Sequence, residues 1–77
     1  MEVENFDRTL NALKRRSPFR PFTVAMVDGD HFEVDFHDSL VVRDGVAVYV
    51  AAGGIPILFD HEGVRQFVGD LREQQDS

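Results

Sequence analysis

The chain has 77 residues, 14 acidic against 8 basic side chains, a net charge of −6 and no cysteine. A chain of this length forms one domain with a small core, and without cysteine it has neither disulfides nor thiolate chemistry. The negative charge disfavours binding to nucleic acid or to anionic membranes. No apolar run approaches the roughly 18 residues that span a bilayer, and the acidic start at Glu2 and Glu4 is unlike a signal peptide. We therefore expect a soluble, cytoplasmic protein.

Residues 2–16 have the apolar spacing of an amphipathic helix. Apolar side chains recur at steps of three and four residues, at Val3, Phe6, Leu10 and Leu13. Acidic side chains come first and basic ones last, which matches the helix dipole. Pro18 ends the pattern, because the residue before a proline is pushed out of the α region.

The next segment alternates apolar and polar residues in the manner of a β-hairpin. Its expected strands are Phe22–Val27 and His31–His37, on either side of an Asp-Gly pair. A three-residue loop at 27–29 keeps the apolar row on one face, whereas a one-residue slip would bury histidine and acids. This loop places Val24 opposite Phe32 and predicts a positive φ at the loop glycine.

Three further strands follow by the same logic, at Leu40–Val42, Val46–Ala52 and Ile55–Asp60. We expect a three-residue loop at 43–45 and a two-residue loop at Gly53-Gly54. This register gives the three strands a common inner row: Leu40, Val42, Val46, Val48, Val50, Ile57 and Phe59.

After the last strand, Asp60 is a candidate cap for a second helix at 61–73. Its apolar stripe would be Val64, Phe67, Val68 and Leu71. The sequence thus predicts one α+β domain over residues 1–77, with a frayed tail at 74–77. Its expected parts are an N-terminal helix, a five-stranded antiparallel meander at 22–60 curled as an SH3-like, partly open barrel, and a C-terminal helix.

The predicted register leaves a second apolar surface on the opposite side of the sheet. We expect it to consist of Val41, Ala47, Tyr49, Ala51, Pro56 and Leu58. Either a helix of the same chain covers it, or it is an interface for a second copy or a protein partner. Pro56 also predicts that the fifth strand lies at a sheet edge, because proline cannot donate to a sixth strand.

Two groups of polar residues resemble chemical sites. The alternating His31, Glu33, Asp35 and His37 would share one strand face, which we interpret as a solvent face rather than a metal site. The second group, residues 60–62, is explained as the start of the C-terminal helix. We therefore expect no catalytic residue, metal, cofactor or small-molecule substrate, and no enzymatic activity.

Five of the cations lie close together near the N-terminus. These are Arg8, Lys14, Arg15, Arg16 and Arg20. They either balance the helix dipole or form a basic docking patch.

Several short motifs resemble a family of short bacterial proteins of unknown function. They are Pro-Phe-Arg-Pro-Phe-Thr-Val at 18–24, Asp28-Gly29, Val34-Asp35-Phe36-His37, Val48-Tyr49-Val50 and Gly53-Gly54. The similarity covers most of residues 3–68 and implies a leading helix and a later β-hairpin, but no activity. Asp38 stands where the family usually has proline, so that turn is expected to differ.

The leading functional hypothesis is a non-enzymatic interaction module that self-associates through the apolar sheet face. The alternative is a nucleic-acid-binding small barrel of the Sm or SH3-like kind, using the basic patch between Arg8 and Arg20. The sequence motifs of Sm proteins are absent, so RNA binding does not follow from the expected fold.

Overall fold

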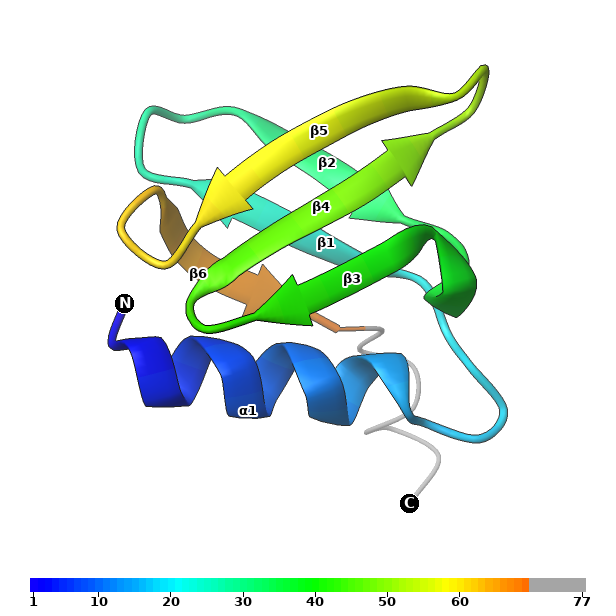
Figure 1. Ribbon diagram of the computed structural model, residues 1–77, viewed down its shortest axis with the longest axis horizontal. Helices are drawn as coiled ribbons and strands as arrows, with labels where there is room; N and C mark the ends of the chain where they lie inside the picture. Colours follow the sequence, from blue (N-terminus) through cyan, green and yellow to red (C-terminus); the bar gives the residue numbers. More distant parts are fainter. Residues whose placement is uncertain (70–77) are drawn as a thin grey trace.

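The chain folds as one helix and six antiparallel strands in two three-stranded sheets, in a computed structural model that describes residues 1–69 (Figure 1). One sheet has the order β2-β1-β6 and the other β3-β4-β5. The elements are α1 (Val3–Lys14), β1 (Phe22–Met26), β2 (His31–Val34), the 3₁₀ turn η1 (His37–Ser39), β3 (Leu40–Arg43), β4 (Val46–Ala51), β5 (Ile55–Asp60) and β6 (Val64–Val68).

The predicted α+β class and N-terminal helix are confirmed, but the predicted five-stranded barrel with a C-terminal helix is wrong. The described residues form six strands and two separate sheets that do not close into a barrel. The sheets lie one behind the other, and α1 runs beside β3 along one open side of the pair (Figure 1). No helix within residues 1–69 has the length and apolar character needed to cross a membrane.

The core lies between the two sheets and is completed by α1. Phe6 and Leu10 of the helix are fully buried. The Phe6 ring touches both sheets, with its centroid 6.0 Å from Phe59 in β5 and 5.9 Å from Phe67 in β6. Each such buried side chain contributes roughly 1.5–3 kcal/mol relative to exposure. The remaining buried residues come from both inner sheet faces: Phe22, Val24, Val34, Leu40, Ala47, Tyr49, Phe59 and Val64.

The first hairpin has the predicted register. Val24 lies opposite Phe32, and Phe22 lies opposite Val34. The three-residue loop at 27–29 is closed by the Gly29 N–H, which donates to the Met26 carbonyl at 3.1 Å. Gly29 has the predicted positive φ, 98°. The strand β2 is shorter than predicted, however, because the chain leaves the sheet after Val34.

The two later hairpins each differ from the prediction by one residue. Asp44 and Gly45 form a two-residue turn with φ values of 52° and 81°, so that Arg43 lies opposite Val46. Such a primed turn matches the strand twist and favours Asp-Gly. The next loop has three residues, 52–54, which puts Ala51 opposite Ile55.

Together, these two differences reverse which side of β4 faces the core, and they do so for no other strand. The faces of β3 and β5 are as predicted, because the second loop offsets the shift made by the first. In β4, Ala47 and Tyr49 point into the core, while the side chains of Val46 and Val50 are exposed on the other side. The apolar alternation did not decide between these arrangements, since β4 is apolar on both faces.

The predicted helix at 61–73 is wrong over the described residues, where β6 pairs with β1 instead. A bulge explains the error. Ala25 lies opposite Gln66 and Met26 opposite Val64, so Arg65 is an extra residue in the ladder. A bulge lets residues three apart share a face, which brings Val64 and Phe67 to the core side and imitates helical spacing. Residues 70–77, including the predicted tail at 74–77, lie outside the described residues.

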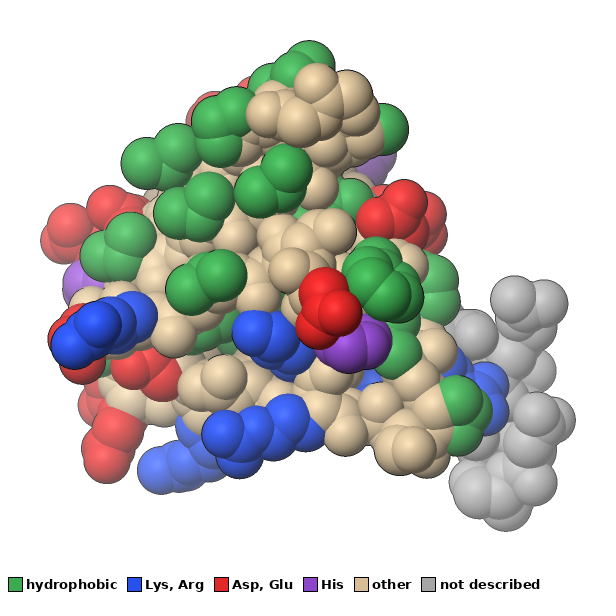
Figure 2. Space-filling view, turned by 45° about the vertical axis from the view of Figure 1, so that its right-hand side comes forward, with side chains coloured by type: hydrophobic (Ala, Val, Ile, Leu, Met, Phe, Trp, Pro, Cys, Tyr) green, Lys and Arg blue, Asp and Glu red, His purple; other side chains and the backbone are tan. Residues whose placement is uncertain are grey.

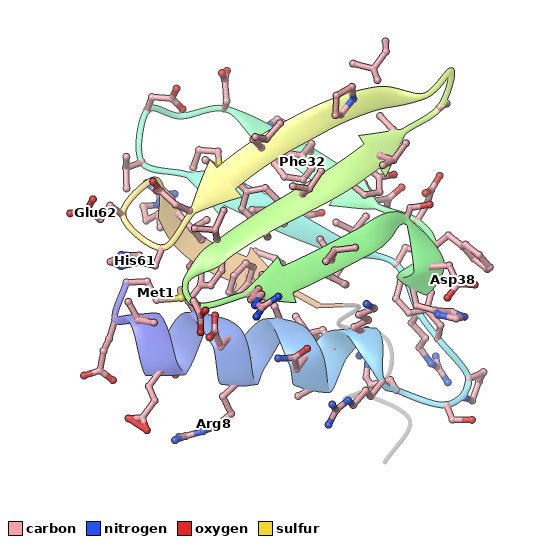
Figure 3. All side chains as sticks on the ribbon, in the orientation of Figure 1. Met1, Arg8, Phe32, Asp38, His61 and Glu62 are labelled. Carbon is pink, nitrogen blue, oxygen red and sulfur yellow. The ribbon has the colours of Figure 1, made fainter. Side chains whose placement is uncertain are left out.

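Two hydrogen bonds attach the start of the chain to the sheets. The Met1 ammonium donates to the His61 carbonyl at 2.8 Å, and the Met1 carbonyl lies 2.8 Å from His61 Nδ1 (Figure 3). In the second turn of α1, Asp7 Oδ1 accepts from the Gly45 N–H at 2.8 Å. The β3–β4 turn is therefore held directly against α1.

Gly45 is buried at this junction and has no room for a side chain. An added Cβ would lie 3.0 Å from the His61 ring and 3.2 Å from both methyl groups of Val3. Gly29 also has a positive φ, but an added Cβ there meets nothing within 4 Å. Comparing substitutions at Gly45 and Gly29 therefore distinguishes the cost of backbone strain from the cost of steric overlap.

Replacing Gly45 by alanine is expected to lower the free energy of unfolding by about 2–4 kcal/mol, through backbone strain and overpacking together. Gly29→Ala should cost only about 1 kcal/mol, because strain acts alone. Urea denaturation of both variants measures the difference. Equal losses would contradict the close approach of α1 to this turn.

Candidate interaction surface

The outer side of the β3-β4-β5 sheet exposes a continuous group of apolar side chains. Val41, Val48 and Leu58 form one row across the three strands, because Val48 is paired with both of the others. Leu58 is 70% exposed and Val41 is 62% exposed. We call this surface the outer face; its apolar members are Val41, Val46, Val48, Val50, Pro56 and Leu58. Figure 2 shows apolar side chains spread across this side of the molecule.

The predicted interface residues are divided between the two sides of the sheet. Val41, Pro56 and Leu58 lie on the outer face and are exposed. The other three, Ala47, Tyr49 and Ala51, lie on the core side, which corrects their predicted placement. Tyr49 is only 4% exposed and cannot be the centre of an external contact. The preference of Asp-Gly for a two-residue turn favours this placement at Asp44-Gly45. The same pair lies in a three-residue loop at 27–29, however, so it was no decisive signal for Val46, Val48 and Val50.

Charged side chains border the outer face at one end. Arg43, Val46 and Asp60 form the row beside the β3–β4 turn, with Val46 paired to both charged residues. Arg43 and Asp60 belong to strands two apart, which puts their backbones about 9–10 Å from each other. A cation and an anion therefore lie at opposite margins of the same apolar surface, and Arg43 Nε also lies 3.8 Å from the exposed Asp44 carboxylate beside it. The strand β5, with Pro56, is at the edge of its sheet, as predicted.

The alternating polar residues of the second predicted strand do not form a ladder. His31 and Glu33 lie in β2 and are exposed, whereas His37 lies in η1, beyond the end of the strand. Asp35 accepts a hydrogen bond from the Tyr49 hydroxyl at 2.7 Å. No three His, Asp or Glu side chains of residues 1–69 gather closely enough to hold a metal ion.

The segment Asp60-His61-Glu62 is a turn between two strands rather than a helix cap. Asp60 Oδ1 accepts from the Gly63 N–H at 2.9 Å, and the His61 N–H donates to the Gly45 carbonyl at 2.8 Å. Glu62 is exposed and points away from the sheets (Figure 3). These contacts fasten the turn and give the group a structural role.

Three of the five clustered cations line a hollow at the end of α1. The hollow has a volume of about 380 Å³ and is lined by Lys14, Arg15, Arg16, Ser17, Phe19 and His37. Arg16 Nη2 donates to the Arg20 carbonyl at 3.1 Å, which connects the fourth cation to this region. Arg8 lies two turns earlier on the exposed side of α1 and points away from the sheets (Figure 3). The predicted patch is therefore a hollow plus one separate arginine.

Comparison of the chain with protein-family models, with curated proteins and with solved structures found no significant match. The functional argument therefore rests on the surfaces of this chain.

The buried Tyr49 links the two sheets and has a shifted ionisation. Its ring stacks on Phe32 of β2 at 5.8 Å, and its hydroxyl donates to Asp35. Burial raises the pKa of Tyr49 above the usual 10.0, and the hydrogen bond to the Asp35 carboxylate raises it further. Because folding raises the pKa of Tyr49, the stabilisation that this side chain contributes is fully present below about pH 10. It is lost as the pH rises through the raised pKa.

The Tyr49 titration is expected to respond to Asp35. Asp35→Asn should lower the pKa of Tyr49 towards its usual value, because it removes the adjacent negative charge. Glu33→Gln is the matched control and should lower the pKa less, since Glu33 acts only at a distance. Tyrosinate absorbance measures this directly, because the chain has one tyrosine and no tryptophan. An equal response to both changes would contradict the hydrogen bond.

Proposed function

We propose that this domain is a non-enzymatic interaction module that pairs with a second copy of itself through the outer face. The observation that carries the proposal is the apolar row of Val41, Val48 and Leu58, in which Val41 and Leu58 are exposed and Val48 is half-buried. Helix α1 lies on the other side of its sheet, packed into the core through Phe6 and Leu10. Contiguous apolar surface that stays exposed on a monomer usually marks an interaction site.

The charges at the margin favour a second copy over an unrelated partner. Rotation by 180° about an axis parallel to β4, lying in the plane of contact, exchanges the positions of β3 and β5. Arg43 of one copy then lies over Asp60 of the other, and the same contact forms twice. A twofold axis perpendicular to the strands would instead put Arg43 over the opposite, uncharged end of the face. The surface is thus self-complementary in one orientation.

The apolar residues fit the same axis. Val41 of one copy faces Leu58 of the other, and the valines of β4 meet their own counterparts along the axis. Strands that pack face to face in nearly parallel directions are typical of β-sandwiches. The strand β4 has six residues, so the contact spans roughly 20 Å by 15 Å. This is below the standard size for a stable complex, and we expect a weak, reversible dimer.

The nucleic-acid alternative depends on Arg8, Lys14, Arg15, Arg16 and Arg20 acting as one surface. Arg8 is not part of the hollow that Lys14, Arg15 and Arg16 line, and it points away from the sheets (Figure 3). The net charge of −6 also opposes association with a polyanion. We therefore favour the outer face as the functional surface.

The substitution Leu58→Glu is expected to abolish the dimer, because it puts a charge at the centre of the apolar contact. Val27→Glu is the matched control: Val27 is 61% exposed but lies in the β1–β2 loop, away from the outer face. Sedimentation equilibrium at rising concentrations measures both variants. A wild-type chain that stays monomeric at high micromolar concentration would refute the proposal, as would equal dissociation of the two variants.

A double-mutant cycle tests the orientation of the dimer. Arg43→Gln and Asp60→Asn should each weaken dimerisation by about three- to tenfold, since each removes two exposed ion pairs. Asparagine retains the oxygen that accepts from the Gly63 N–H, so the turn is kept. The double variant should be no weaker than either single variant. Fully additive losses in the dimerisation constants would contradict the axis along β4.

A further inference from the structure

We propose that the hollow at the end of α1 binds a phosphate monoester carried on a small ligand with a planar ring. The lining combines three cationic side chains, Lys14, Arg15 and Arg16, with the Ser17 hydroxyl and an aromatic wall. Its volume of about 380 Å³ lies within the range of small-molecule sites. This site is separate from the outer face and does not depend on self-association.

Two of the cations are available for an anion. Among the described residues, no carboxylate pairs with the Lys14 ammonium or the Arg15 guanidinium. Lys14 is half-buried, so an anion bound there is partly removed from water and interacts more strongly with the cation. Arg16 is held in place through its hydrogen bond to the Arg20 carbonyl. A guanidinium and an ammonium together suit the several oxygens of a phosphate.

One acidic side chain lies beside the hollow. Asp38 Oδ1 is 2.9 Å from His37 Nδ1, and this carboxylate opposes an incoming anion. The side chain of Asp38 is directed to solvent at η1 (Figure 3). Within residues 1–69, Lys14 and Arg15 against the Asp38 carboxylate leave the hollow locally positive, although the whole chain is acidic. The local field therefore favours a compact anion over an extended polyanion.

Aromatic rings beside the cations define the rest of the ligand. His37 lies between Phe19, at 5.8 Å between ring centroids, and Phe36, at 4.7 Å. Phe36 is 50% exposed and is not part of the lining itself, but its ring contacts His37, which is. An exposed ring beside phosphate-binding cations suits a base that stacks while its phosphate is held. A nucleoside monophosphate has this combination of ring and charge.

The proposal is tested by titrating the full chain, followed by amide NMR shifts, with inorganic phosphate, adenosine 5′-monophosphate and adenosine. We expect saturable shifts at residues 14–19 and 36–38, with the nucleotide binding more tightly than phosphate and adenosine most weakly. Phe36→Ala should reduce the affinity for the nucleotide to that for phosphate. Equal binding of adenosine and its monophosphate would overturn the phosphate site.

Two double variants with the same change in net charge distinguish binding in the hollow from a general effect of charge. The pair Lys14→Gln and Arg15→Gln should weaken nucleotide binding at least about tenfold, because it removes two charge-assisted contacts. The control pair Arg8→Gln and Arg65→Gln changes the net charge equally but lies outside the lining, and it should change affinity less than about twofold.

The NMR spectrum of each variant also reports whether it folds. Equal losses in the two pairs would overturn the proposal. Single-stranded RNA that binds far more tightly than the nucleotide, and is lost with Arg8, would also overturn it in favour of an extended nucleic-acid surface.

Discussion

The insertion of Phe6 and Leu10 between the two sheets is the interaction on which the rest of the structure depends. A domain of 77 residues has a small core, so its stability depends on each element that adds apolar surface to it. The helix adds such surface by placing the Phe6 ring against Phe59 of one sheet and Phe67 of the other. Both inner faces are then used, and the single helix of the described residues is on the core side. The outer face is exposed as a consequence.

The same packing explains which side of β4 turns inward. Tyr49 fits the core because its ring stacks on Phe32 and its hydroxyl reaches Asp35 at the rim. A buried tyrosine hydroxyl needs such a partner. The small side chain of Ala47 leaves room beside it, and the valines of β4 are left for the outer side. The Gly45 turn, held by Asp7 of α1, connects this register to the position of the helix.

Much of the local structure could be predicted, because it depends on strong local patterns. Val3 to Leu13 follow one helical stripe, and a slip in the first hairpin would bury His31 and Glu33. The second and third hairpins lacked this constraint, since a strand with apolar residues on both sides tolerates either face. β6 was mistaken for a helix because a bulge at Arg65 gives Val64 and Phe67 helical spacing. The outer face was therefore only half identified, through Val41, Pro56 and Leu58, and the hollow was not predicted because it joins α1 to η1.

The central claim is that the β3-β4-β5 sheet has one side in the core and one side that self-associates. Isotope-filtered NMR on a mixture of labelled and unlabelled chains tests it most directly. The account predicts intermolecular methyl contacts between Val48 and Val48, and between Val41 and Leu58. Intermolecular contacts that involve Phe32 or Tyr49, or that arise only from other surfaces, would contradict it.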